Sequence, residues 1–241
     1  MPYGLVMGAS GDIGQAICYT LAEEGWSLYC HYHHNQEKVL NLVSDLQQRY
    51  PQQDFFVVSL NMLEESAIST FVSQLFQVDA VIFASGFTVY ELLPETTSQQ
   101  MDSLWQVHVK TPLILLQQLQ VKLAKNGRGR VVFISSVYGQ RGSSMETVYS
   151  AVKGAQESFV KAYAKEVASL GITVNAIAPG AVNTQMNQNW TSDEKVSLAA
   201  DIPLGRMAEP NEVAAACKYV CSKEASYTTG TTLVVAGGWM D

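Results

Sequence analysis

The fold is decided near the N-terminus by Leu5-Val6-Met7-Gly8-Ala9-Ser10-Gly11-Asp12-Ile13-Gly14. The apolar start of this stretch predicts a buried strand over residues 3–8, and the glycines predict a tight turn before a helix starting near Gln15. Glycines at a helix N-terminus let phosphate oxygens approach backbone N–H groups. A glycine cluster alone is a weak signal, but its position between a strand and a helix indicates a nucleotide site.

The same alternation of short apolar runs and amphipathic stretches continues along the chain. Runs such as Val131-Val132-Phe133-Ile134 are apolar at consecutive positions, which is typical of parallel strands covered on both faces. The sequence therefore predicts one α/β domain over residues 1–241, with a doubly wound, seven-stranded parallel sheet and helices on both faces. Strands are expected near residues 3–8, 27–32, 54–60, 79–84, 130–135, 172–178 and 231–236.

The composition and the net charge limit the classes of partner that the protein is expected to bind. Hydrophobic residues make up 47% of the 241-residue chain and charged residues only 15%, which favours a compact domain. A net charge of −7 gives no general attraction for nucleic acid or an anionic membrane. We find no run of signal-peptide or membrane-spanning character and expect a cytoplasmic protein. Four scattered cysteines, two of them at positions 217 and 221, are expected to be free thiols in the core rather than a metal or redox site.

A phenol and an ammonium are spaced for joint chemistry. Tyr149 and Lys153 are four residues apart and lie on one face of a predicted helix. We expect Lys153 to lower the pKa of Tyr149 and make it a usable proton donor for a carbonyl substrate. Ile134-Ser135-Ser136 ends a predicted strand, and the carboxyl ends of parallel strands form the ligand crevice. The pattern indicates carbonyl reduction.

The segment after the second predicted strand selects the nucleotide. A site for NAD normally has an acidic residue there, which binds the ribose hydroxyls. This chain has Cys30-His31-Tyr32-His33-His34-Asn35, without a carboxylate, and so favours NADP(H). A metal site of Cys30, His31, His33 and His34 is the alternative, but adjacent strand residues point to opposite faces and we expect no metal.

Along its entire length the chain resembles the short-chain dehydrogenase/reductase family. The resemblance rests on Gly8 to Gly14, on Ser136 thirteen residues before Tyr149, and on Asn175-Ala176-Ile177-Ala178-Pro179-Gly180 followed by Thr184. It implies a single-domain Rossmann fold. It further implies that Ser136 holds the substrate carbonyl oxygen, Tyr149 delivers the proton and Lys153 also binds the nicotinamide ribose. The region of Ile177 and Thr184 would contact the carboxamide. The cofactor residues implied are Gly8, Ser10, Gly11, Asp12, Ile13, Gly14, Tyr32, His33, His34, Asn35, Asn61, Met62, Ala84, Ser85, Gly86, Tyr149, Lys153, Pro179, Gly180, Val182 and Thr184.

Three positions depart from the family pattern. Asp12 takes the place of a glycine and brings a carboxylate near the expected pyrophosphate, or else caps the following helix. Phe83-Ala84-Ser85-Gly86 lacks an asparagine that braces the sheet in the family. His108 stands where the family has the asparagine of its catalytic tetrad. We hypothesise that His108 holds a water linked to Lys153, since one ring nitrogen can donate while the other accepts. A core histidine bonded to the backbone is the alternative.

Within the family, the general resemblance is to 3-oxoacyl-acyl-carrier-protein reductases, and a sharper one is to elongation factor P 5-aminopentanone reductases. The sharper one rests on His108, on the helix from Tyr149 to Gln156 and on Pro179-Gly180-Ala181-Val182. Glu146 favours it physically, because a carboxylate at the pocket rim attracts an ammonium and repels a phosphopantetheine arm. The alternative for Glu146 is a solvated charge without a role in binding. Two other functions are also alternatives, namely a general ketone or sugar-alcohol dehydrogenase and a catalytically silent scaffold.

Two proteins are candidates for the carrier of the substrate. The basic residue before the turn at Gly171 in carrier-protein reductases is Leu170 here, although Lys125, Arg128 and Arg130 are near. Modified elongation factor P and acyl carrier protein both stay possible partners of the expected small carbonyl substrate. Residues 181–206, with a short helix near residues 193–200, are expected to form a lid, and a plain surface insertion is the alternative. The substrate residues expected are Tyr138, Glu146, Met186 and Trp190. The resemblance implies a homotetramer with residues 100–125, 147–170 and 239–241 in interfaces.

Overall fold

A computed structural model describes residues 1–185 and 191–239, except for the side chains of Ser192 and Lys195. Its centre is a seven-stranded sheet in the order β3-β2-β1-β4-β5-β6-β7, in which neighbouring strands pair in parallel. The strands are β1 (Tyr3–Met7), β2 (Ser27–Tyr32), β3 (Phe55–Ser59), β4 (Ala80–Phe83), β5 (Arg130–Ile134), β6 (Thr173–Pro179) and β7 (Thr232–Val235). Each predicted strand is present, and the predicted doubly wound fold is confirmed.

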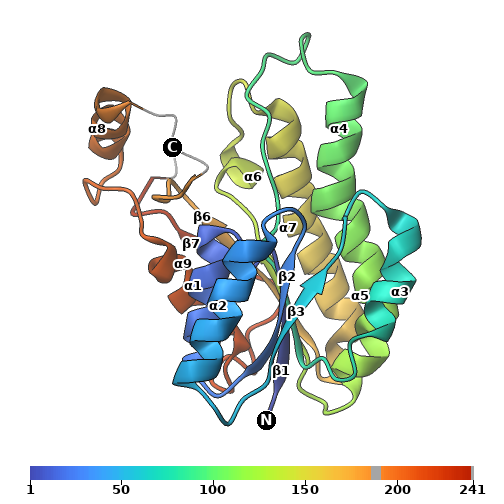
Figure 1. Ribbon diagram of the computed structural model, residues 1–241. Helices are drawn as coiled ribbons and strands as arrows, with labels where there is room; N and C mark the ends of the chain where they lie inside the picture. Colours follow the sequence, from blue (N-terminus) through green and yellow to red (C-terminus); the bar gives the residue numbers. More distant parts are fainter. Residues whose placement is uncertain (186–190, 240–241) are drawn as a thin grey trace.

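Helices cover both faces of the sheet, as Figure 1 shows. One layer holds α1 (Asp12–Glu23), α2 (Gln36–Arg49) and α9 (Pro210–Cys221), and the other holds α3 (Ile68–Ser73), α4 (Ser98–Trp105), α5 (Thr111–Ala124) and α7 (Thr147–Val167). Two short helices, α6 (Tyr138–Arg141) and α8 (Ser192–Asp201), lie at the carboxyl end of the sheet (Figure 1). Short 3-10 turns occupy Glu65–Ala67 and Ala168–Leu170.

Successive residues of a strand pack into two separate hydrophobic cores, one on each face of the sheet. Leu5 packs in one cluster with α5 and α7, whereas its neighbour Val6 packs in the other with α1 and α9. Because side chains alternate between the faces of a strand, a sheet covered on both sides needs apolar residues at consecutive positions. That is why the strands could be recognised as continuous apolar runs.

Two local features differ from expectation. Helix α1 begins at Asp12 rather than near Gln15, with Gly11 as its N-cap residue and no side-chain cap. The alternative role of Asp12 as a helix cap is therefore wrong. Between α4 and α5 the chain forms a π-helical turn, Gln106–Lys110, which contains His108. Such turns interrupt the regular helical hydrogen bonds and occur often at functional sites.

The stretch expected to form the lid contains helix α8, close to the helix predicted over residues 193–200. Met186 and Trp190, predicted to contact substrate, lie outside the described residues. None of the described helices is both long and apolar enough to cross a membrane.

Candidate active site

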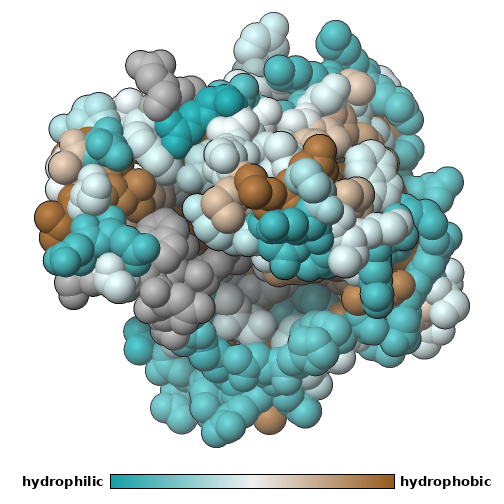
Figure 2. All heavy atoms as spheres, turned by 90° about the horizontal axis from the view of Figure 1, so that it is seen from above, coloured by the Kyte–Doolittle hydropathy of each residue, from teal (hydrophilic) through white to brown (hydrophobic). Residues whose placement is uncertain are grey.

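A cavity of about 520 Å³ opens at the carboxyl ends of β4, β5 and β6. The molecule seen from this end is hollowed near its centre (Figure 2). Such an edge is where ligands bind in open α/β sheets. The predicted residues that line it are Gly11, Asp12, Ile13, Gly14, Ala84, Ser85, Gly86, His108, Ser136, Tyr138, Glu146, Tyr149, Lys153, Pro179, Gly180, Val182 and Thr184.

The remaining predicted cofactor residues lie outside the lining of this cavity. They follow β1, β2 and β3 on the side of the glycine loop, and they are Gly8, Ser10, Tyr32, His33, His34, Asn35, Asn61 and Met62. The rings of His33 and His34 lie against each other at a tilt of 40° with centroids 3.5 Å apart, and both residues are exposed. Ile177 is fully buried in the core and is not part of the lining, so its expected contact with the carboxamide is wrong.

The glycine loop is tight enough to require its glycines. Gly8 has a φ of +84°, and a Cβ on Gly14 would lie 2.1 Å from the Gly8 carbonyl oxygen. His31 braces the loop, because its Nδ1 accepts from the Gly8 N–H at 3.1 Å while Nε2 bonds the Leu60 carbonyl at 3.0 Å. Burial lowers the pKa of His31 to about 4, so the ring is neutral and can accept. The sequence had suggested His31 only as a metal ligand.

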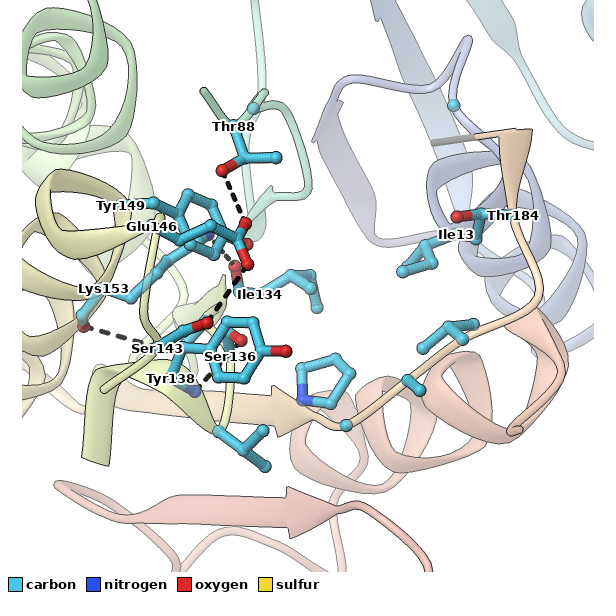
Figure 3. Close-up of a pocket in the computed structure, with 18 of the residues that line it drawn as sticks. Ile13, Thr88, Ile134, Ser136, Tyr138, Ser143, Glu146, Tyr149, Lys153 and Thr184 are labelled. Atoms are coloured by element: carbon cyan, nitrogen blue, oxygen red, sulfur yellow. Dashed lines mark hydrogen bonds between the residues drawn. The ribbon is translucent and has the colours of Figure 1, made fainter. Parts of the chain in front are cut away.

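Ser136, Tyr149 and Lys153 come together on one side of the cavity (Figure 3). Ser136 follows β5 and hydrogen-bonds the side chain of Tyr149, which projects from α7. The Lys153 ammonium donates to the Ile134 carbonyl at 2.8 Å and lies 5.4 Å from the centroid of the Tyr149 ring. The three side chains that spacing singled out therefore share one pocket.

The electrostatics of this group differ from expectation. The pKa of Tyr149 is raised by burial and then by the carboxylate of Glu146, and the hydrogen bond from Ser136 offsets only part of this. The predicted lowering of the pKa of Tyr149 is therefore wrong: burial and Glu146 raise it, and the Lys153 ammonium donates to the Ile134 carbonyl. Burial lowers the pKa of Lys153 itself to about 7, and the carboxylate of Glu157 opposes that shift. Tyr149 thus stays protonated at neutral pH while Lys153 titrates there.

His108 is buried and bonded to the backbone, as in the core-histidine alternative, and its part in a proton relay stays a prediction. Its side chain is buried, with Nε2 bonded to the Phe87 carbonyl at 2.8 Å. Nδ1 is also buried and has no hydrogen-bond partner among the described residues. Burial and the charge of Lys153 lower the pKa of His108 to about 3, so the ring is neutral. Nε2 also lies 3.3 Å from the Phe87 N–H. In the tautomer in which Nε2 donates to the carbonyl, Nδ1 is left as an acceptor beside the site.

Gly86 explains how an imidazole fits in this position. A Cβ at Gly86 would lie 2.2 Å from Cε1 of His108. The ring of His108 meets the ring of Tyr149 edge to face, with centroids 5.6 Å apart. The glycine after Ser85 therefore makes room for the histidine that packs against Tyr149.

Glu146 lies at the cavity rather than on an open surface (Figure 3). Thr88 Oγ1 donates to its carboxylate at 2.7 Å, and Ser143 Oγ does so at 3.4 Å. On another part of the lining, the ring of Tyr138 meets Trp239 edge to face at 6.0 Å. Glu146 and Tyr138 are thus placed where they were predicted, and Trp239, assigned from the sequence to an interface, lines the cavity.

Asp12 contacts the segment after β6. Its Oδ2 accepts from the Gln185 N–H at 2.6 Å, and Oδ1 lies 3.9 Å from the ammonium of Lys38. Lys38 also donates to the Gln185 side chain at 2.7 Å. The carboxylate that replaces a family glycine therefore ties the glycine loop to the start of the 181–206 segment.

Several lining residues were missed, namely Thr88, Tyr90, Ile134, Ser135, Val137, Ser143, Ser144, Ala181, Gln185, Glu194 and Leu198. Ser143 precedes Tyr149 closely enough to have been considered, but nothing in the spacing of Thr88 or Leu198 marks them. The four cysteines are buried, as predicted, with the Sγ atoms of Cys18 and Cys30 3.9 Å apart. Among described residues, no group of three or more His, Cys, Asp or Glu is arranged to hold a metal ion.

Comparisons with known proteins give the same assignment. A family model described as Enoyl-(Acyl carrier protein) reductase matches residues 8–240. An oxidoreductase of Bacillus subtilis, YmfI, described as uncharacterized, is 39% identical over 98% of this chain and 97% of its own. The 3-oxoacyl-[acyl-carrier-protein] reductase FabG of Rickettsia bellii is 31% identical over 98% of this chain and 95% of its own. The crystal structure of YwfH, an NADPH dependent reductase involved in bacilysin biosynthesis, superposes with a TM-score of 0.93 at 23% identity, covering 100% of this chain and 98% of its own. With its sheet order, glycine loop and serine, tyrosine and lysine around one cavity, the chain belongs to the short-chain dehydrogenase/reductase family of oxidoreductases.

Proposed function

We propose that this protein is an NADP(H)-dependent reductase that converts a ketone into a secondary alcohol, and that its substrate is 5-aminopentanone-modified elongation factor P. The observation that carries the proposal is the cavity in which Ser136, Tyr149 and Lys153 meet the carboxylate of Glu146. The trio supplies the chemistry of carbonyl reduction, and Glu146 selects a cationic substrate.

The residues present fit a dinucleotide. The glycine loop has no room for a side chain at Gly8 or Gly14, and helix α1 begins within it at Asp12, so that backbone N–H groups are available to a phosphate. The end of β2 has no carboxylate to repel a ribose phosphate, and the exposed His33 and His34 follow it. YwfH, a protein of the same fold, is described as NADPH dependent. When bound, the cofactor supplies a hydride to the carbonyl carbon.

The protein residues handle the oxygen and the proton. Ser136 donates a hydrogen bond to the substrate carbonyl oxygen, and the same oxygen takes the proton of the Tyr149 phenol as negative charge develops on it. The raised pKa of Tyr149 keeps that proton in place until then. Lys153 lies near enough to stabilise the phenolate that forms.

The Lys153 ammonium returns a proton to the phenolate and is itself reprotonated from solvent through a water that His108 would hold. A water accepting from Lys153 and donating to Nδ1 of His108 would satisfy the one buried ring nitrogen without a partner in the described chain. The neutral state of the ring suits an acceptor. In this proposal His108 takes over the position of the family asparagine.

Glu146 favours the cationic substrate over an anionic one. Thr88 and Ser143 direct its carboxylate, and the half-buried position strengthens its attraction for an ammonium. A phosphopantetheine arm would meet like charge. Arg130, which could have served an acidic carrier protein, is only 6% exposed and donates to the backbone of Gly129 and Ser222.

The alternative is a 3-oxoacyl-acyl-carrier-protein reductase, which the likeness to FabG favours. The deciding experiment follows NADPH oxidation by the purified protein with acetoacetyl thioester and with aminopentanone-modified elongation factor P. We expect a higher kcat/KM for the modified factor and loss of this preference in Glu146→Gln. A higher kcat/KM for the thioester in the wild type would favour the alternative, and turnover of neither would favour the silent scaffold.

We further propose a cytoplasmic homotetramer. The groove between α5 and α7, lined by Leu113, Ile114, Phe159 and Tyr163 among others, offers an apolar face for a second copy. Sedimentation equilibrium measures the assembly, and a monomer at micromolar concentration would contradict it.

A further inference from the structure

A buried carboxylate lies directly behind the catalytic group and has no part in the mechanism above. Glu157 follows Lys153 by four residues on α7, so the two side chains lie on one face of the helix. Glu157 is 5% exposed and Lys153 is 4% exposed. Buried charges of this kind are rare unless they are paired.

Hydrogen bonds tie Glu157 to three other elements. Ser135 Oγ, at the end of β5, donates to Oε1 at 3.0 Å, and Gln140 Nε2, on α6, donates to Oε2 at 2.9 Å. Thr232 Oγ1, on β7, donates to Oε2 at 3.4 Å. Ser135 precedes Ser136, so the carboxylate fixes the backbone that presents the expected catalytic serine.

The packing of α6 on α7 is close at the same place. A Cβ on Gly139 would lie 2.9 Å from the Lys153 carbonyl carbon and 3.1 Å from Oε1 of Glu157. Helix α6 therefore packs directly against the carboxylate of Glu157. The position of the negative charge is set by the fold.

The groups around Lys153 leave Glu157 as its counter-charge. Burial lowers the pKa of Lys153, and the Glu157 carboxylate is the one charge that raises it. From the π-helical turn His108 faces Lys153 as a neutral ring. Tyr149, on α7, remains protonated, and Glu146 acts on Tyr149 from the N-cap of the same helix. Tyr138, on α6, also faces Tyr149.

We propose that Glu157 is a positioning residue for the reduction, which supplies the negative charge next to Lys153 on α7 and holds the end of β5 that carries Ser136. The inference rests on the proposed ketone reduction. Removing the negative charge favours the neutral amine of Lys153, so the proton relay is lost at a lower pH than in the wild type. Loss of the hydrogen bonds alone would reduce the rate at every pH alike.

The test is the pH dependence of kcat/KM for a small ketone at saturating NADPH, measured for wild type, Glu157→Gln and Glu157→Asp. In Glu157→Gln we expect the alkaline loss of rate to move down by about one pH unit, which is about tenfold in rate on that limb. Glu157→Asp restores the charge and is expected to keep the wild-type midpoint even where its plateau is lower. Glu166→Gln, an exposed change on the same helix, is the matched control.

An unchanged midpoint in Glu157→Gln, with far-UV circular dichroism and thermal midpoint like those of wild type, would overturn the inference. A Glu157→Gln protein that does not fold leaves Glu157→Asp to decide, since a midpoint that moves down by about one pH unit in Glu157→Asp, which keeps the charge, also overturns it. Failure of the proposed function is a different result, because the wild type itself would then reduce no ketone.

Discussion

The floor and the rim of the cavity carry different kinds of residue. On the floor, Lys153 and His108 are almost fully buried, and burial is the largest cause of their pKa shifts. At the rim, Glu146 and Tyr138 stay partly exposed, and the Glu146 carboxylate accepts a hydrogen bond from Thr88. The difference teaches that the fold sets the proton chemistry, while a few replaceable side chains set the substrate.

The largest expected effect comes from the floor. Tyr149→Phe removes the proton donor but leaves the ring that packs against His108. We expect kcat to fall by about 10²–10⁴-fold, the range for loss of a general acid. Single-turnover NADPH oxidation measures the step, and fluorescence titration checks that NADPH still binds. A rate within threefold of wild type, roughly 0.6 kcal/mol, would place the proton donor elsewhere.

His108 allows a graded test of the floor. We expect His108→Ala to lose roughly 10-fold or more in kcat and to change the pH profile, because the water between Lys153 and Nδ1 loses its partner. His108→Asn introduces the family residue and is expected to recover most of the rate. Equal turnover and an unchanged pH profile in His108→Ala would leave His108 a core residue only.

Glu146→Gln is expected to change the substrate preference set at the rim and to leave the proton chemistry of the floor unchanged. We expect kcat/KM for an aminoketone to fall by about 10-fold, since an exposed-to-half-buried ion pair is worth on the order of 1 kcal/mol. For a neutral ketone of the same length we expect little change, because the proton chemistry is untouched. Steady-state kinetics with the two ketones measures the contrast, and equal losses for both would show that Glu146 acts on Tyr149 instead.

The pH dependence of the wild-type rate tests only the floor of the cavity, through the protonation state of Lys153. The pKa of Lys153 is lowered to about 7, so its ammonium is present below that pH and is lost as pH rises through it. We therefore expect kcat/KM for ketone reduction to be constant at acid pH and to fall toward alkaline pH with a midpoint near that value. A profile that rises through neutrality would contradict a protonated Lys153 in the relay.

The smallest effect is expected at the glycine loop. His31→Asn removes the imidazole that accepts from the Gly8 N–H. We expect KM for NADPH to rise a few fold, about 1 kcal/mol for one hydrogen bond, with kcat nearly unchanged. A change confined to kcat would mean that His31 acts on the catalytic side, and thermal denaturation controls for loss of packing.

The sheet could be predicted from the sequence because each of its strands is buried on both faces. The run Val131 to Ile134, for example, has no other explanation at that length. The start of α1 was misplaced because Gly11 caps it without a side-chain signal. The π-helical turn at His108 depends on packing against Gly86, which no local pattern encodes.

Within the site, spacing identified Ser136, Tyr149 and Lys153, but not their electrostatics. The sign of the pKa shift at Tyr149 depends on burial and on the carboxylate of Glu146. Ile177 was assigned to the cofactor by motif alone, although a strand residue pointing into the core cannot reach it. Glu157 escaped attention because an acidic residue on a helix is usually exposed.

The most direct test of the central claim is isotopic. The purified protein is given a ketone and NADPH carrying deuterium at the transferable position of the nicotinamide, and the alcohol is analysed by mass spectrometry and NMR. We expect one deuterium on the carbinol carbon, with the product formed by wild type and scarcely by Tyr149→Phe. Alcohol without the label, or equal labelled product from both proteins, would contradict a hydride reduction in which Tyr149 donates the proton.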